Sequence, residues 1–408
     1  MQNERHYLTC PDCDALNLDI EVPDSHRAHC YRCDAELYRQ QHNKAEKIIV
    51  YSLTALLCFI LANLFPFMTL QSGGLEQQTQ LFSGSLALLA YGYPALGALV
   101  FVTSELFPLL VILALLYTHA PQHWPINLPA TLRVYRVLQH LLPWSLLGVF
   151  MLGVIVAMIK LLDLAAIIAG PSLFSLAAML IFMLLALSAM DSRHITGSIS
   201  LPHSQIPTQN IEHHDLLSCH SCRLILPSEH QGQACPRCGS KIHKRKPDSL
   251  AKTWALVVTA AMLYIPANLY PIMTVQQFGI GSADTIISGV ISLIDANMLG
   301  IALLVLFASV IVPMLKLLAL AFLLISVQRG SVWRQKDRTR LYRITEWIGA
   351  WSMLDIFLIG ILVSLVQMNS LATISPEPGA IFFAAVVIMT MFAAHSFDPR
   401  LIWDKHNE

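Results

Sequence analysis

The sequence predicts an all-α polytopic membrane protein, and three observations support that prediction. The chain has 408 residues, of which 55% are hydrophobic and only 13% charged, with a mean hydropathy of +0.58. Soluble proteins usually carry about 25% charged residues. Several apolar runs reach the roughly 20 residues that a helix needs to cross a bilayer. The alternating segments of a transmembrane β-barrel, each about ten residues long, are not visible.

The chain also reads as two copies of one module. The phrase ANLFPFMT at 62–69 returns as ANLYPIMT at 267–274, with six of the eight letters the same. The segment WSLLGVFMLG that begins at Trp144 aligns with WSMLDIFLIG from Trp351, and MDSRHI from Met190 aligns with FDPRLI from Phe397. The offsets are 205 or 207 residues. Repeats at fixed offsets predict a tandem duplication, with halves near 1–204 and 205–408.

Each half is predicted to hold a polar, cysteine-containing head followed by a four-helix transmembrane bundle. The predicted domains are 1–43 (head), 44–204 (four spans), 205–248 (head) and 249–408 (four spans). The spans of the first half are expected near 46–68, 86–118, 136–168 and 171–190. Those of the second half are expected near 251–273, 290–327, 342–367 and 377–396. The second and third spans of each half exceed one straight crossing, so we expect them to tilt, kink or extend beyond the bilayer.

Loop charge predicts the orientation of the chain. Four crossings per half put both heads on one side of the membrane. Apart from Lys160 and Lys316, the lysines and arginines fall in the heads, in the connections on that side, or near the adjoining span ends. The opposite segments, 70–83, 169–171, 275–288 and 368–376, have no Lys or Arg. The positive-inside rule therefore places both heads and both termini in the cytoplasm.

Eight cysteines form two patterns that are typical of small metal sites. Each head has two Cys-x-x-Cys pairs, separated by 16 residues in the first head and by 12 in the second: Cys10, Cys13, Cys30 and Cys33, then Cys219, Cys222, Cys235 and Cys238. Four thiolates at this spacing predict a structural, closed Zn²⁺ site in a zinc-ribbon, rubredoxin-like head. Gly239, just after the last pair, suits a turn with positive φ. Iron with an electron-transfer role is an alternative, and disulfides are disfavoured in the reducing cytoplasm.

The repeated asparagine–proline phrase lies at the end of the first span in each half. Pro66 and Pro271 lack the amide hydrogen that would bond a helical carbonyl, so each is expected to kink the span or end it near the far interface. The adjacent side chains of Asn63 and Asn268 are positioned to bond a freed carbonyl or a neighbouring helix. Direct contact with transported cargo is the alternative role of the phrase.

Ionisable residues lie inside several predicted spans. A charge at mid-bilayer costs about 2.5–3.5 kcal/mol on insertion scales, so such residues are expected to be paired or to line a polar cavity. Lys316 and Asp355 are the natural pair in the second half. Lys160 and Asp163 lie near the end of a span, where snorkelling is also plausible. Asp355 aligns with Gly148, so the second half is predicted to be the functional one. The remaining residues of this group are Glu105 and Asp295.

Basic residues gather in two segments, Lys241–Ser249 and Gln328–Arg343. Contact with anionic lipid headgroups is the favoured interpretation. Nucleic-acid binding is the weaker alternative, and we expect no nucleic-acid partner.

Together these motifs resemble the paraquat-inducible protein A family of bacterial inner-membrane proteins. The resemblance covers nearly the whole chain and includes ANLYPIMT, ASVIVPMLK, WSMLDIFLIGILVSLV and VVIMTMFAAHSFDPRLIWD. It implies a non-enzymatic role in envelope lipid transport, beside a periplasmic MCE-domain partner. It also implies that phospholipid is loaded or extracted at the inner membrane, and that Lys316 and Asp355 match polar positions of the family's membrane domain. Gly148 departs from the acidic residue expected in the first repeat.

Three functions remain open at this point. In the first, a polar pocket around Lys316 and Asp355 shelters a phospholipid headgroup, and protonation or pairing of Asp355 gates it. In the second, the chain is a membrane redox protein with iron in its heads. In the third, it is a passive anchor for the periplasmic partner. No phosphate-binding P-loop is visible, so any energy must come from a gradient, a partner or the lipid itself.

Overall fold

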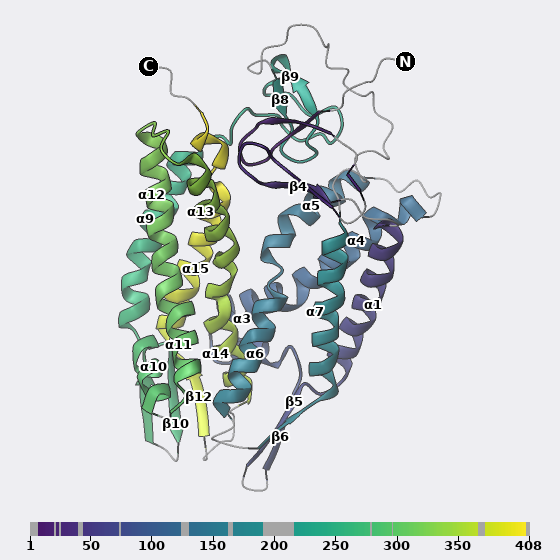
Figure 1. Cartoon of the computed structure of the whole chain (residues 1–408). Helices are drawn as coiled ribbons and strands as arrows, with labels where there is room; N and C mark the ends of the chain where they lie inside the picture. The colour runs from purple at the N-terminus through teal and green to yellow at the C-terminus, as the bar shows by residue number, and fades with distance from the viewer. Residues whose placement is uncertain are drawn as a thin grey trace.

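The structure is a computed structural model that describes residues 7–19, 22–23, 26–39, 44–72, 75–123, 130–161, 166–190, 216–277, 280–295, 297–365 and 372–404. Long helices fill the middle of the molecule (Figure 1). The cysteine-containing hairpins lie at one end, and small β-sheets lie at the opposite end (Figure 1).

Within the described residues, eight helical segments are long and apolar enough to cross a membrane, which confirms the predicted number of spans. Their positions agree with the predicted spans except at the edges. They are Lys44–Leu64, Pro94–Pro121, Thr131–Ile159, Pro171–Ala189, Ser249–Leu269, Leu299–Gln328, Gln335–Leu365 and Pro378–Ser396.

The helices follow one order in both halves. The first half contains α1 (Lys44–Leu64), α2 (Ser83–Ala90), α3 (Pro94–Phe101), α4 (Phe107–His123), α5 (Thr131–Leu141), α6 (Leu147–Leu161) and α7 (Pro171–Ala189). The second half contains α9 (Ser249–Leu269), α10 (Ile286–Asp295), α11 (Leu299–Leu306), α12 (Val312–Gln328), α13 (Gln335–Ile348), α14 (Leu354–Leu365) and α15 (Pro378–Ser396).

The long second and third spans are interrupted rather than straight. A π-helical turn joins α3 to α4 at Val102–Leu106, and another joins α11 to α12 at Phe307–Ile311. A 3₁₀ turn separates α5 from α6 at Leu142–Trp144, where Pro143 cannot donate a helical hydrogen bond, and another separates α13 from α14 at Gly349–Met353. Each interruption lets the two parts of a span present different faces to their neighbours.

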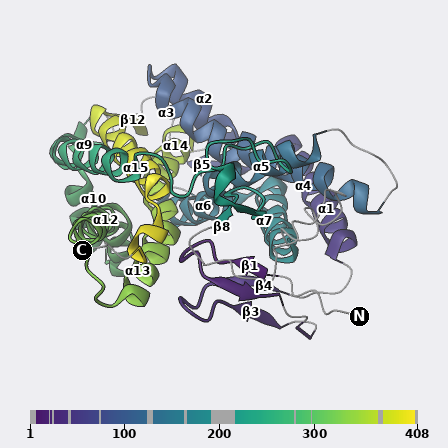
Figure 2. The same cartoon turned by 90° about the horizontal axis from the view of Figure 1, so that it is seen from above.

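The helices pack as two groups that meet at α14. In the first half α1 packs along α7 and α4, and in the second half α9 packs along α15 and α12. Helix α14 contacts α6, α2 and α3 of the first half, and it lies with α6 between the two groups (Figures 1 and 2). All twelve residues of α14 are buried. Helices α1 and α9 instead expose apolar side chains such as Leu57 and Met262 on the outside of the molecule, as expected for helices that face lipid.

Short β-strands at both ends of the molecule depart from the predicted all-α fold. At the end opposite the heads, β5 (Met68–Ser72) lies between β6 (Leu75–Thr79) and β7 (Ala166–Ala169). In the same way β10 (Met273–Gln277) lies between β11 (Ile280–Asp284) and β12 (Ala372–Pro376). All pairings are antiparallel. These segments follow the ends of the spans, and a sheet satisfies their backbone groups without continuing the helices.

Candidate functional site

The first head brings its four cysteines to one point. Hairpins β1–β2 (Tyr7–Thr9, Leu16–Leu18) and β3–β4 (Arg27–His29, Glu36–Arg39) each present one Cys-x-x-Cys pair in their turn. The Sγ atoms of Cys10 and Cys33 are 3.4 Å apart, and those of Cys13 and Cys30 are 3.6 Å apart. All four side chains are buried.

The second head repeats this arrangement. Its first pair lies in the turn of β8–β9 (Leu216–Ser218, Ile225–Pro227), and its second pair lies between the bridged residues Ala234 and Lys241. The Sγ atoms of Cys219 and Cys238 are 3.5 Å apart, and those of Cys222 and Cys235 are 3.6 Å apart. The ligand atoms of each head all lie within 4.8 Å of one another.

The two clusters fit a tetrahedral metal ion. A tetrahedron with Zn–S bonds of about 2.3 Å has sulfurs roughly 3.8 Å apart, close to the distances in both heads. A disulfide needs about 2.05 Å, and all of these cysteines are free. The disulfide alternative is therefore not formed. Four sulfur donors suit zinc or iron, and they leave no open coordination position for catalysis.

One backbone feature recurs in all four Cys-x-x-Cys turns. The residue four positions after the first cysteine has positive φ, and its amide donates to the carbonyl of that cysteine. Positive φ was predicted for Gly239 and is confirmed at 71°. The other three positions hold residues with side chains, for which positive φ was not expected: Asp14, Asp34 and Arg223.

The repeated phrase ends each first span instead of kinking it. Helix α1 stops at Leu64 and α9 at Leu269, in each case two residues before the proline. Of the two effects expected of Pro66 and Pro271, a kink in the span or its end, the structure has the second. A residue that precedes proline disfavours helical backbone, and Tyr270 is accordingly extended, so the chain leaves the helix and enters a strand.

The phrase contacts the start of the fourth span in both halves. The amide of Gly170, which precedes α7, donates to the carbonyl of Phe67 at 2.9 Å, and the Ser172 hydroxyl donates to the carbonyl of Ala62. In the second half the amide of Gly379 donates to the carbonyl of Pro271 at 2.9 Å. Donors at a helix N-terminus thus satisfy carbonyls at the end of another helix.

The two phrase asparagines bond within their own helices. Asn63 Nδ2 donates to the Phe59 carbonyl at 3.0 Å, and Asn268 Nδ2 donates to the Tyr264 carbonyl at 2.8 Å. Asn63 Nδ2 also lies 3.4 Å from Glu105 Oε2. The expected bond to a neighbouring helix is therefore present in the first half, and its acceptor is a buried carboxylate of the π-helical turn.

Lys316 lies near the middle of the span Leu299–Gln328 and is only 3% exposed. Its Nζ has no hydrogen-bond partner among the described residues. A Cβ atom built on Gly349 would lie 2.7 Å from Nζ, so the 3₁₀ turn approaches the ammonium group closely. Two buried hydroxyl groups also lack a hydrogen-bond partner within the described chain. They belong to Ser309, in the π-helical turn before α12, and Ser352, in the 3₁₀ turn before α14.

Asp355, in the first turn of α14, is 6% exposed. It lines a small pocket with α10 and β10, together with Ile272, Gly289 and Asp284. The pocket volume of about 40 Å³ has room for a few water molecules. The predicted salt bridge from Lys316 to Asp355 is not formed, because Nζ of Lys316 bonds to no carboxylate and the ammonium instead packs on Gly349.

Glu346 of α13 lies close enough to Lys316 for their charges to interact, but Glu105 and Asp295 do not contact Lys316. Glu105 is buried beside Asn63 in the first half. Asp295 ends α10 and is exposed. The side chain of Lys160, like the whole of Asp163, lies outside the described residues.

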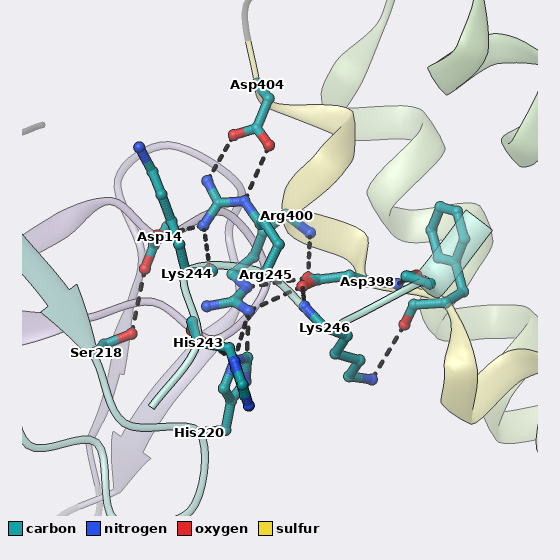
Figure 3. Close-up of polar contacts among 12 residues, drawn as sticks. Asp14, Ser218, His220, His243, Lys244, Arg245, Lys246, Asp398, Arg400 and Asp404 are labelled. Atoms are coloured by element: carbon teal, nitrogen blue, oxygen red, sulfur yellow. Dashed lines mark hydrogen bonds and ion pairs between the residues drawn. The ribbon is translucent and has the colours of Figure 1, made fainter. Parts of the chain in front are cut away.

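A network of ion pairs ties the heads to the second bundle (Figure 3). Arg245 donates to Asp14 of the first head at 2.8 Å and to Asp404 near the C-terminus at 2.5 Å. In the segment Lys241–Ser249, which we expected to contact lipid headgroups, Arg245 therefore makes intramolecular ion pairs. Burial lowers the pKa of Arg245, but its hydrogen bonds and charge interactions with these two carboxylates outweigh that effect and raise it above its usual value.

A buried ion pair follows the last helix, and the sequence analysis missed its importance. Asp398 accepts from Arg400 at 2.8 Å and from the Lys246 amide at 2.9 Å, and Arg400 also contacts His220 of the second head at 2.9 Å (Figure 3). Burial alone would raise the pKa of Asp398. The hydrogen bonds and charge of Arg400 outweigh that effect and lower it to about 2. The repeated segment FDPRLI could have predicted this ion pair, because it places the carboxylate of Asp398 two residues before the guanidinium of Arg400.

Comparison with known proteins decides the family. The profile described as paraquat-inducible protein A matches residues 45–199 and 250–407. The chain belongs to the paraquat-inducible protein A family. Within this family, it is 34% identical to "Intermembrane transport protein PqiA" of Escherichia coli (strain K12), over 98% of this chain and 96% of that protein. No solved structure matches the chain.

Two further relatives have names that concern the cell envelope or transport. "Lipophilic envelope-spanning tunnel protein A" of Escherichia coli (strain K12) is 30% identical over 98% of this chain and 92% of its own length. "Probable intermembrane transport protein" of Haemophilus influenzae (strain ATCC 51907 / DSM 11121 / KW20 / Rd) is 26% identical over 97% and 95%. Family membership and the eight apolar helices together indicate a multi-pass membrane protein.

Proposed function

We propose that this protein is the inner-membrane component of an envelope lipid-transport system and moves phospholipid without changing it chemically. Relatives that match nearly the whole chain are named as intermembrane transport proteins, which supports a transport role. The observation that carries the proposal is Lys316, a lysine buried in the middle of a candidate span with no hydrogen-bond partner among the described residues.

A buried ammonium group is costly in hydrocarbon unless it meets an anion or water. A phospholipid headgroup supplies a phosphodiester anion that would offset this cost as it passes. The hydroxyls of Ser309 and Ser352 are buried without a hydrogen-bond partner in the described chain, so they add donors for the same group. Asp355 lines a pocket beside α10, and we propose that a change in its protonation alters access to the site.

We propose that the heads are zinc ribbons, each with one structural Zn²⁺ held by its four cysteines. The sulfur geometry supports a tetrahedral ion, and burial of the four sulfurs supports a structural role. Iron and electron transfer form the alternative function for the same donors. We further propose that the chain is a tandem duplication, since the two matched segments both begin just after a head and the helices follow one order in both halves.

We propose that both heads face the cytoplasm and that the sheets β6–β5–β7 and β11–β10–β12 face the periplasm. The absence of Lys and Arg from the sequence of the sheet-side segments supports this orientation. An MCE-domain protein would then meet the sheet side. Cysteine labelling of intact cells at Ala283, an exposed residue of β11, tests the orientation, because an impermeant reagent labels only a periplasmic position.

Substitution of Lys316 tests the transport role. We expect Lys316→Ala to lose most lipid transport, measured as envelope barrier function in cells that depend on this protein. The neighbouring Leu315 is 54% exposed on the outside of the molecule, so Leu315→Ala is the matched control and should keep wild-type function. Normal barrier function in a well-expressed Lys316→Ala variant would refute the transport role of this site. A variant that still binds the partner but does not transport would refute the passive-anchor alternative.

A further inference from the structure

Each cysteine head packs against helices of the other half of the chain. The buried cysteines of the first head belong to one hydrophobic cluster with Tyr342 of α13 and with Phe397 and Trp403. Arg32 of the same head lies 4.6 Å over the Trp403 ring. The first head therefore packs on the bundle of the second half.

The second head makes the reciprocal contact. Its cysteine cluster packs against Leu132 of α5, which belongs to the third span of the first half. Arg136, one turn further along α5, donates from its guanidinium to the carbonyl of Cys238. Each head thus contacts the bundle of the other half of the chain, and the second head also contacts its own half through His220 and Arg400.

The contact of the first head with α13 also involves a guanidinium. The Arg343 guanidinium donates to the Asp12 carboxylate at 2.6 Å, to the Cys33 carbonyl at 3.2 Å and to Cys33 Sγ at 3.3 Å. The Arg343 side chain is 30% exposed and Asp12 is 18% exposed, so both are largely shielded from water. The bond to Sγ reaches an atom that would be a metal ligand.

Arg136 and Arg343 occupy equivalent positions. They are 207 residues apart, the same offset that relates Trp144 to Trp351, and each ends an Arg-x-Tyr-Arg sequence. Their targets are equivalent as well, because Cys33 and Cys238 are each the fourth cysteine of a head. An accidental contact would not recur at matching positions on both sides.

We propose that each metal centre is completed by an arginine from the other half of the chain, Arg343 for the first head and Arg136 for the second. Four thiolates around a divalent ion leave a net negative charge, and a guanidinium beside the fourth cysteine offsets it. Mutation of a residue that hydrogen-bonds to a metal ligand typically lowers metal affinity by about 10- to 100-fold. In this arrangement, metal in either head also holds the two halves together.

Metal release from the full-length, zinc-loaded protein in detergent tests this inference. A chromogenic zinc chelator reports the release rate, and cysteine alkylation followed by mass spectrometry reports which head has opened. In Arg343→Gln, zinc should leave the first head about 10-fold faster or more, with Cys30 and Cys33 alkylated first. In Arg136→Gln, the second head should open first, with Cys235 and Cys238 alkylated.

Two further variants complete the test. Arg340 lies on the same helix and is 58% exposed, with a contact at 3.6 Å to Asp34 but none to a cysteine in the described chain, so Arg340→Gln should release zinc at the wild-type rate. Asp12→Asn removes the carboxylate that orients Arg343, so zinc release should become faster from the first head only. This variant keeps the test decisive if Arg343→Gln does not fold. Unchanged release rates in Arg343→Gln and Arg136→Gln, or equal acceleration of both heads, would overturn the inference.

This inference rests on the proposal that the heads hold metal. Different results would refute the metal proposal and the role of the arginines. A wild-type protein that binds no zinc refutes the metal proposal. A wild-type protein that holds zinc in both heads, with variants that release it normally, refutes the role of the arginines alone.

Discussion

Gly349 lies directly against the ammonium group of Lys316, so that a Cβ atom at position 349 would be 2.7 Å from Nζ. Glycine lets the 3₁₀ turn between α13 and α14 approach a buried charge that has no hydrogen-bond partner in the described chain. In the second half of the chain, the 3₁₀ turn that interrupts the third span and the charge of Lys316 in the second span therefore form one structural unit.

Substitution of this glycine should separate function from stability. Gly349→Ala adds a methyl group that the flexible end of Lys316 can avoid, and its φ of −54° is ordinary for alanine. We expect a change in unfolding free energy within about 1 kcal/mol, because alanine also favours helical backbone. We expect transport to fall sharply, because the ammonium group is displaced. Barrier assays and thermal unfolding in detergent measure the two effects.

The matched control for this variant is Gly300→Ala. A Cβ atom at Gly300 meets nothing within 4 Å, so this variant should keep both stability and transport. If Gly349→Ala transports as well as Gly300→Ala, close approach to Lys316 has no functional importance.

Metal analysis should find about two zinc ions per chain, one for each four-cysteine cluster. Replacement of Cys33 by serine should reduce this to about one ion and should lower the thermal midpoint, because structural zinc contributes directly to folding. The buried Cys58 in α1 belongs to neither cluster, so Cys58→Ser leaves the metal content unchanged. Elemental analysis that finds iron with a reversible visible absorbance would instead support the redox alternative.

The pH dependence of stability should reveal the buried Asp398. Burial raises the pKa of Asp398, but the hydrogen bonds and charge of Arg400, with the Lys246 amide as a further donor, outweigh burial and lower it from 3.8 to about 2 in the folded protein. A lowered pKa stabilises the folded state above about pH 4, and this contribution is lost as the pH falls towards 2. It amounts to about 2 kcal/mol at neutral pH.

The variant Asp398→Asn should remove this contribution. Its thermal midpoint should lie below that of the wild type at pH 7, and the two should converge as the pH falls from 4 to 2. Asp404 is 40% exposed, so Asp404→Asn should have a smaller effect. If the thermal midpoints of Asp398→Asn and the wild type instead differed by a constant amount across this pH range, Asp398 would contribute to stability through packing rather than through its charge.

Local properties of the sequence predicted the spans and the metal ligands well. A span needs only a long apolar run, and the Cys-x-x-Cys spacing brings two sulfurs together within one turn. The order of helices in each half followed from repeated phrases such as ANLYPIMT. These features depend on neighbouring residues, and a single sequence is enough to recognise them.

Features that depend on contacts between distant residues were not predictable. Helices α6 and α14 are both strongly apolar in sequence, but α14 is buried on all sides because α2, α3 and α6 of the other half surround it. The pairing of Lys316 with Asp355 was wrong for the same reason. Both are buried charges in one bundle, but the 3₁₀ turn at Gly349 presents backbone to the ammonium group.

The contact between the repeated phrase and the fourth span should be essential in both halves. A Cβ atom at Gly170 would lie 2.1 Å from the Pro66 carbonyl oxygen, and one at Gly379 would lie 2.4 Å from that of Pro271. These neighbours are backbone atoms, which cannot rotate away as a side chain can. We expect Gly170→Ala and Gly379→Ala each to destabilise the protein by roughly 2 kcal/mol or more.

Thermal unfolding in detergent measures this loss, and Gly289→Ala is the control because nothing lies within 4 Å of a Cβ atom there. If the phrase only ended a helix, both substitutions would behave like the control, since each lies about one hundred residues away in sequence. A loss of similar size at both positions would instead establish that the phrase is repeated because each copy anchors a strand and the start of the fourth span at the same point.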